Sequence, residues 1–141
     1  MSDPLRAINQ KSTTESEPRW MGWLILFVRI VAVLSIAKGL YHWGLVCGIG
    51  DPTGTAFESA PLAWQTATVF FAIIDLVAGV GLWLAAAWGG VVWLTAAISM
   101  AAVEVLFPQI YGGRLTVVII ELVGVAAYLG LMVLASRQPA E

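Results

Sequence analysis

Four long apolar stretches dominate this sequence and restrict what the chain can fold into. They run over about residues 20–46, 62–87, 91–107 and 115–135. A helix needs roughly 20 apolar residues, each rising 1.5 Å, to cross about 30 Å of hydrocarbon. Strands of a membrane β-barrel are instead about ten residues long and alternate in polarity, a pattern that none of the stretches shows. The sequence therefore predicts an all-α integral membrane protein with four transmembrane helices in an antiparallel bundle.

The composition agrees with a chain that has lipid as its main solvent. Hydrophobic residues make up 60% of the 141 residues and charged residues 11%, about half the charged share of a typical soluble domain. The net charge is -2 and no basic run is present, so we expect a lipid bilayer and no nucleic acid as partner. No metal, haem, dinucleotide or nucleophile motif is found, and we therefore expect neither a cofactor nor enzymatic activity.

The domain organisation follows from the polar segments between the apolar stretches. Residues 1–19 are polar and mixed in charge and are predicted to form a tail, whereas residues 20–136 form one four-helix transmembrane domain. Residues 47–61 are rich in Gly, Pro and Thr and are typical of a loop. The segment "WGG" at 88–90 predicts a tight hairpin, and "PQIYGG" at 108–113 predicts a turn after the third helix.

The orientation is predicted from the basic residues outside the apolar stretches. With an even number of helices both termini lie on one side, which carries Arg6, Lys11, Arg19 and Arg137. The opposite side carries only Arg114. Because Lys and Arg accumulate on the cytoplasmic side, four against one places the tail and both termini in the cytoplasm of a bacterial inner membrane.

Six ionisable side chains lie inside the predicted helices, where each charge costs on the order of 2.5–3.5 kcal/mol by insertion scales. Such residues usually face the bundle interior and pair with one another. The basic groups all come from the first helix, and the acidic groups come from the other three. Matching their depths at about 1.5 Å per residue gives three predicted ion pairs: Arg29–Asp75, Lys38–Glu121 and His42–Glu104.

The helical phase adds detail to this intramembrane polar network. Lys38 and His42 are four positions apart and share a face, whereas Arg29 is nine positions before Lys38 and about half a turn out of phase. Arg29 must therefore face a different neighbour. Tyr128 lies two turns beyond Glu121 on the same face, where its hydroxyl is expected to hydrogen-bond into the inner pair.

The polar network has three interpretations that the sequence leaves open. Structural ion pairs would fix the register and assembly of the helices. A proton or ion relay, or a small transporter, would also use carboxylates with a histidine. Binding of a lipid or quinone is the third. Because the chain is small and has no soluble domain, we expect a non-catalytic accessory or assembly subunit of a membrane complex, in contact with other subunits or a second copy.

Two strings carry a resemblance to known proteins. "RIVAVLSIAKGLYHWGLVCGI" and the later "GLWLAAAWGGVVWL" resemble an uncharacterised family of small four-helix bacterial inner-membrane proteins, a domain of unknown function. That resemblance implies the fold and no activity. A looser similarity is to DoxX-type proteins, which have four helices and a basic residue with Gly early in the first helix. Small multidrug transporters are of similar size but depend on a carboxylate in the first helix, where this chain has Arg29 and Lys38.

Overall fold

The computed structural model describes residues 19–137, so the tail predicted over residues 1–19 lies outside the described residues apart from Arg19. The described part is all-helical and has no strand. Its helices are α2 (Arg19–Val46), α3 (Ala56–Ser59), α4 (Leu62–Trp83), α5 (Ala87–Leu106), α6 (Pro108–Tyr111) and α7 (Leu115–Ser136). The four long ones, α2, α4, α5 and α7, are long and apolar enough to cross a membrane. The predicted helical class with four such helices is confirmed.

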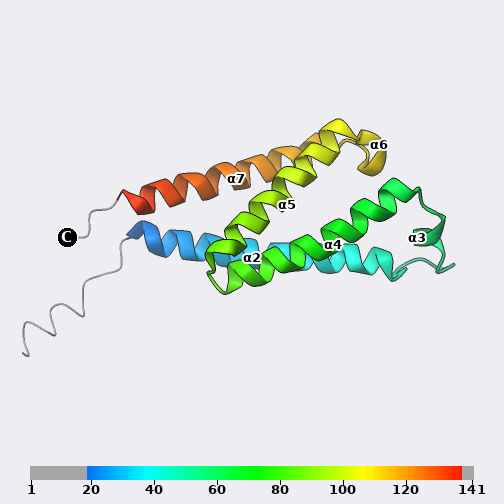
Figure 1. Cartoon of the computed structure of the whole chain (residues 1–141), viewed down its shortest axis with the longest axis horizontal. Helices are drawn as coiled ribbons and strands as arrows, with labels where there is room; N and C mark the ends of the chain where they lie inside the picture. Colours follow the sequence, from blue (N-terminus) through cyan, green and yellow to red (C-terminus); the bar gives the residue numbers. More distant parts are fainter. Residues whose placement is uncertain (1–18, 138–141) are drawn as a thin grey trace, which may run out of the picture.

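The long helices contact one another in a closed order. Helix α2 packs most extensively on α4, α4 packs on α5, α5 on α7, and α7 returns to α2. Figure 1 shows both ends of the described chain at one end of the molecule, which we call the terminal end. The short helices α3 and α6 lie at the opposite end, which we call the loop end. Helices α2 and α7 thus connect the two ends, and α4 and α5 run back from the loop end towards the terminal end.

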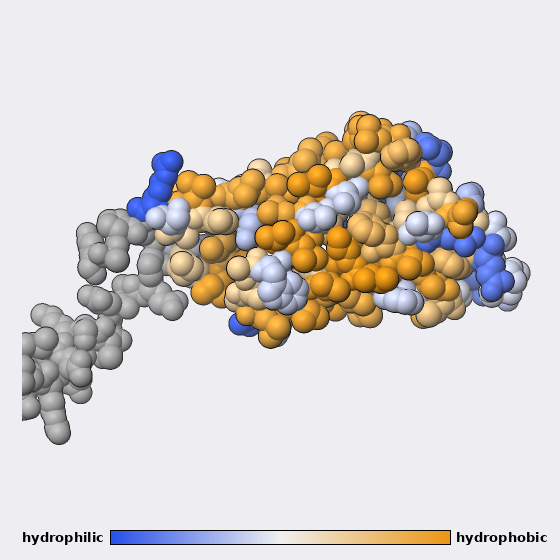
Figure 2. Space-filling view, in the orientation of Figure 1, coloured by the Kyte–Doolittle hydropathy of each residue, from blue (hydrophilic) through white to orange (hydrophobic). Residues whose placement is uncertain are grey.

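The outer surface along the long helices is apolar. Figure 2 shows hydrophobic residues over most of this face, with hydrophilic ones gathered mainly at the loop end. Large side chains such as Leu34, Val91 and Ile120 are more than half exposed. Soluble monomers rarely expose apolar patches of more than a few hundred Å². The surface and the four apolar helices therefore fit a multi-pass membrane protein.

The connection between α4 and α5 differs from its prediction. Helix α4 was expected to continue to residue 87, with a hairpin at 88–90, but it ends at Trp83 and α5 begins at Ala87. The turn lies between them, and its strained residue is Ala85, with φ of 52°. The glycines of "WGG" are instead buried in the first turn of α5.

The reason for this difference is that these glycines serve helix packing. A Cβ placed on Gly81 of α4 would lie 2.6 Å from the Cα of Gly89, far inside any normal contact. The two backbones therefore touch, which only glycine permits at such a crossing. A Gly-Gly pair between apolar stretches is equally typical of a turn, and the sequence alone does not separate the two uses.

The turn between α4 and α5 stops short of the terminal end (Figure 1). Leu76 lies against Gly39, and the Trp83 ring lies under the Arg29 guanidinium. The last turn of α4 is therefore level with Arg29 of α2. Residues 19–28 of α2 extend beyond it, by about 15 Å at 1.5 Å of rise per residue. This leaves a recess beneath the turn.

Candidate functional site

Lys38 is at the centre of a polar cluster formed by α2, α4 and α7. Its Nζ atom donates a hydrogen bond to Oε1 of Glu121 at 2.7 Å, and lies 3.4 Å from Oδ1 of Asp75. The structure thus brings Lys38 and Glu121 together, as matching their depths had predicted. It adds Asp75 as a second acid on the same ammonium group.

The predicted Arg29–Asp75 pair is wrong. Asp75 contacts Lys38, and the Arg29 guanidinium lies 4.8 Å from the centre of the Trp83 ring. The prediction counted the depth of Asp75 from a helix end at residue 87, whereas α4 ends at Trp83. The end of α4 is also level with Arg29 and not with the start of α2. Asp75, eight residues before Trp83, therefore lies about 12 Å from Arg29 towards the loop end, close to the level of Lys38.

Asp75 is the most unusual member of the cluster. The residue is fully buried, and neither carboxylate oxygen has a hydrogen-bond partner within the described part of the chain. Its nearest ionisable neighbours are Lys38 and the His42 ring, whose Nδ1 lies 4.0 Å from Oδ2. Buried carboxylates normally accept hydrogen bonds. Asp75 therefore depends on the electrostatic field of Lys38.

The predicted His42–Glu104 pair is also wrong. His42 donates from Nδ1 to the Lys38 carbonyl oxygen at 2.9 Å, one helical turn earlier. Glu104 instead accepts a hydrogen bond from the backbone N–H of Arg114 at 2.8 Å, and its Oε1 lies 4.0 Å from Nε of Arg114. Helix α6 reverses the chain after α5, and this brings Arg114 back over Glu104. The sequence had placed Arg114 only in a loop.

Tyr128 does not join the inner pair. It lies about two turns from Glu121 towards the terminal end, where its ring packs edge-on against Trp93, with centroids 5.6 Å apart. Its hydroxyl lies close to Gly90 of α5. Tyr128 and Glu121 share a helix face, but about 10 Å along α7 separates them. The Tyr128 hydroxyl therefore does not reach the pair of Lys38 and Glu121.

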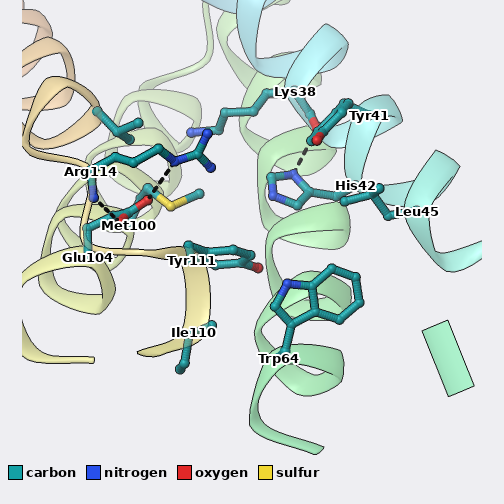
Figure 3. A pocket seen from close by; sticks show the side chains of 11 residues that line it. Lys38, Tyr41, His42, Leu45, Trp64, Met100, Glu104, Ile110, Tyr111 and Arg114 are labelled. Atoms are coloured by element: carbon teal, nitrogen blue, oxygen red, sulfur yellow. Dashed lines mark hydrogen bonds and ion pairs between the residues drawn. The ribbon is translucent and has the colours of Figure 1, made fainter. Parts of the chain in front are cut away.

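A cavity of about 380 Å³ opens beside this cluster at the loop end. The four long helices and α6 all contribute to its wall: Lys38, Tyr41, His42, Leu45, Trp64, Met100, Glu104, Ile110, Tyr111, Arg114 and Val117. Figure 3 shows Lys38, His42, Tyr111 and Arg114 directed towards one shared space. We call this space the loop-end pocket. Its volume is at the small end of the roughly 300–1,000 Å³ range of ligand pockets.

Aromatic residues that sequence reasoning missed form one wall of the loop-end pocket. The ring of Tyr111 lies 6.3 Å from those of His42 and Phe71, between centroids. The hydroxyls of Tyr111 and Thr68 are 3.2 Å apart. Burial raises the pKa of the Tyr111 phenol, and the charges of Glu104 and Asp75 raise it further. Tyr111 therefore keeps its proton at neutral pH, but a tyrosine in a predicted turn gave no signal of this role.

The polar groups around the loop-end pocket can recognise a ligand in two ways. Since Nδ1 of His42 donates to a carbonyl, Nε2 of the neutral ring is a hydrogen-bond acceptor on the pocket wall. Arg114 has a largely exposed side chain and only a 4.0 Å contact to Glu104, so most of its donors are free to meet an oxygen atom. Within residues 19–137 no three His, Cys, Asp or Glu side chains are grouped to hold a metal ion.

The interior changes character towards the terminal end. Beyond Asp75 the core consists of Ala32, Ala78, Leu82 and Trp93. Gly79 adds close backbone contact here, because a Cβ on it would lie 2.6 Å from Cγ1 of Ile36. This apolar plug separates the loop-end pocket from the terminal end. On this side of the cluster the buried polar side chain is Ser35 of α2.

Comparison with known protein families matches the chain to a family of unknown function, DUF6163, over residues 22–139. The chain belongs to this family. The DUF6163 match covers α2 from residue 22 onwards, all of α4, α5 and α7, and every residue of the polar cluster. It agrees with the resemblance to an uncharacterised family, whereas the similarity to DoxX-type proteins is not shown. Neither the curated proteins nor the solved structures gave a match.

Proposed function

We propose that this protein is a non-catalytic protein of a bacterial inner membrane that binds a small amphipathic molecule of the lipid or quinone class in the loop-end pocket. One observation carries the proposal. The cavity beside Lys38 combines two cationic side chains with a neutral histidine and an aromatic wall, and an apolar plug closes it towards the terminal end. That arrangement is typical of a binding site that is open on one side.

The apolar plug favours binding over a proton relay or transport path. A relay across the membrane needs ionisable groups or water on both sides of the bilayer centre. Here the cluster of Lys38, Asp75 and Glu121 is followed by alanine, leucine and tryptophan side chains. Ser35 is buried in this part of α2, and Tyr128 packs against the apolar core from α7. Within residues 19–137, however, no further carboxylate or histidine follows Asp75 towards the terminal end.

The chemistry of the pocket wall supports a flat molecule that carries oxygen atoms. A ring packs well between aromatic side chains such as Tyr111 and Trp64. Arg114 would donate to a carbonyl or hydroxyl oxygen of that ring, and Nε2 of His42 would accept from a hydroxyl group. The volume of about 380 Å³ suits a substituted ring with part of a tail.

The orientation of the helices in the membrane is inferred from the basic residues outside them. Both termini are cytoplasmic in this proposal, and the four long helices form an antiparallel bundle in the membrane. Arg29, level with the turn between α4 and α5, adds a further positive charge towards the cytoplasmic side. The loop-end pocket then opens towards the outer face of the membrane.

Ligand-induced stabilisation of the purified protein tests the proposal. A short-chain quinone added to the detergent-purified chain should raise its melting temperature, because a ligand that binds only the folded state stabilises it. Arg114→Gln and the pocket-filling Met100→Trp should each abolish the rise. Arg137→Gln removes the same charge away from the pocket and should keep it.

The same experiment has a clear negative result. An equal shift in wild type and both pocket variants would place any binding elsewhere. No shift with quinones, together with no small molecule extracted from protein purified out of native membranes, would overturn the proposal.

An accessory-subunit role is a second candidate, favoured by the exposure of α7. Of its 22 residues, Val118 is the only buried one, so most of the helix surface is open to lipid or to a partner subunit. A photo-crosslinking residue in place of Ile120 should capture a second protein in native membranes. Capture of lipid alone would contradict this role.

A further inference from the structure

A second cavity, of about 210 Å³, lies in the recess beneath the turn between α4 and α5. Arg29 and Tyr128 line it together with residues 85 and 86 of the turn and Ala87 of α5, and Leu24 and Ile25 of α2 form part of its apolar wall. It shares no residue with the loop-end pocket. We call it the Arg29 cavity.

Arg29 is the charged group of this cavity, and the described part of the chain gives it no acidic partner. Within residues 19–137 no carboxylate lies within ion-pair distance of its guanidinium, which instead rests over the Trp83 ring at 4.8 Å. A cation over an aromatic face interacts through that face. The N–H groups at the edge of the guanidinium remain available for an anion, and their fork geometry matches two oxygens of a phosphate group.

The surroundings of Arg29 decide which kind of anion fits. The α2 segment that extends beyond the turn is apolar from Trp20 to Val28. The side chains of Ile25 and Ile30, on either side of Arg29, are about half exposed. A free inorganic anion would have to give up its hydration to enter this apolar environment, which is energetically costly. An anion that carries acyl chains keeps them against the same apolar surface.

We propose that the Arg29 cavity binds the phosphate group of an anionic membrane phospholipid. Arg29 holds the phosphate, and the Tyr128 hydroxyl supplies a neutral hydrogen-bond donor from α7. The recess is essential, because it lets a headgroup reach Arg29 although residues 19–28 continue past that level. Arg29 thereby gains the negative partner that the rest of the described chain does not supply.

Native mass spectrometry of the full chain tests this site. Phosphatidylglycerol and phosphatidylcholine with matched acyl chains are added separately to the detergent-purified protein. Wild type should retain phosphatidylglycerol in preference to phosphatidylcholine. Arg29→Gln should lower the retained phosphatidylglycerol about tenfold, the loss expected for one charge-assisted contact. Arg19→Gln removes the same charge from the terminal end outside the cavity and should change retention less than about twofold.

Two further arms distinguish a lipid bound in the Arg29 cavity from a free anion and from lipid bound elsewhere on the surface. Ile25→Trp keeps Arg29 but fills the cavity from an exposed position, so it should also lower retention, and it remains informative if Arg29→Gln fails to fold. Inorganic phosphate at millimolar concentration should not displace the lipid. Displacement by phosphate would show a site for a free anion and overturn the proposal. Equal retention of the two lipids, or unchanged retention in Arg29→Gln and Ile25→Trp, would also overturn it.

Discussion

At the scale of single residues, the sharing of Lys38 between two acids changes what its removal should do. Lys38→Met leaves both Asp75 and Glu121 without a cation. Breaking a buried ion pair from one side costs up to about 3–5 kcal/mol, and here two carboxylates are affected. We expect a large fall in folded yield and melting temperature, measured by size-exclusion chromatography and thermal unfolding in detergent.

The matched control is a series of compensating variants. Adding Glu121→Gln to Lys38→Met removes one uncompensated charge but leaves Asp75, so stability should return only in part. The triple variant with Asp75→Asn carries no uncompensated charge and should recover most of it. If the double variant is as stable as the triple one, Asp75 does not depend on Lys38 and the three side chains do not form one cluster.

Residue partners could be predicted only where the helix ends were predicted correctly. Lys38 and Glu121 meet because the bounds of α2 and α7 agree with the predicted stretches to within a residue. Asp75 was matched to Arg29 because α4 was expected to reach the terminal end, whereas it ends level with Arg29. The partner of His42 is Lys38, one turn earlier in the same helix, and the partner of Glu104 is Arg114, ten residues later and just after α6. Matching depths across helices does not consider such local partners.

At the scale of helices, the glycines between α4 and α5 give the clearest test of packing. A Cβ on Gly81 would collide with the backbone of Gly89, so Gly81→Ala should force the two helices apart and lower the melting temperature. Gly130→Ala is the matched control, because no atom outside its own helix lies within 4 Å of the added Cβ. Alanine should be neutral or slightly stabilising there. Equal melting temperatures for the two variants would mean that α4 and α5 do not touch at Gly81.

The loop between α2 and α4 gives a pH-dependent prediction. The Asp51 carboxylate accepts hydrogen bonds from the backbone N–H groups of Thr53 and Ala56, at 3.0 and 2.8 Å, and so holds the start of α3. These bonds lower the pKa of Asp51 below its ordinary value of 3.8. The stabilisation is therefore complete above that value and is lost as the pH falls through the lower pKa of the folded state.

Amide hydrogen exchange measures this effect. The protection factor of the Ala56 amide should be constant from neutral pH down to about pH 4 and should fall only in more acidic solution. Asp51→Ala should remove the protection at every pH. A protection factor that already declines near pH 6 would point to a different titrating group.

The presence of the four long helices was the most predictable feature of the fold, and the residues at which they end were less predictable. Length and continuous apolar character separate the four long helices from all other segments. The end of α4 depends on whether Gly89 and Gly90 form a turn or a helix contact, which only the neighbouring helix decides. The two short helices, α3 and α6, have four residues each, and this is too short for a periodic pattern to reveal them.

At the scale of the whole molecule, the two ends differ in polarity and in openness. The loop-end pocket carries the cluster around Lys38, whereas the Arg29 cavity lies towards the terminal end with a single charged residue. If the termini are cytoplasmic, the loop-end pocket takes its ligand from the outer side and the Arg29 cavity takes a lipid from the inner leaflet. The membrane topology therefore decides on which side of the membrane the loop-end pocket and the Arg29 cavity each lie.

Cysteine labelling in intact cells tests that topology. The single native cysteine, Cys47, is exposed and must first be replaced by serine. In that background, Thr55→Cys places a thiol in the loop beside α3, and Arg137→Cys places one just after α7. A membrane-impermeant maleimide should label the first in intact cells and the second only after permeabilisation. Even without Arg137, the basic residues near the termini outnumber Arg114 three to one and keep the terminal end inside. The reverse pattern would place the loop-end pocket in the cytoplasm and the Arg29 cavity in the outer leaflet, and would show that Arg114 outweighs the basic residues near the termini.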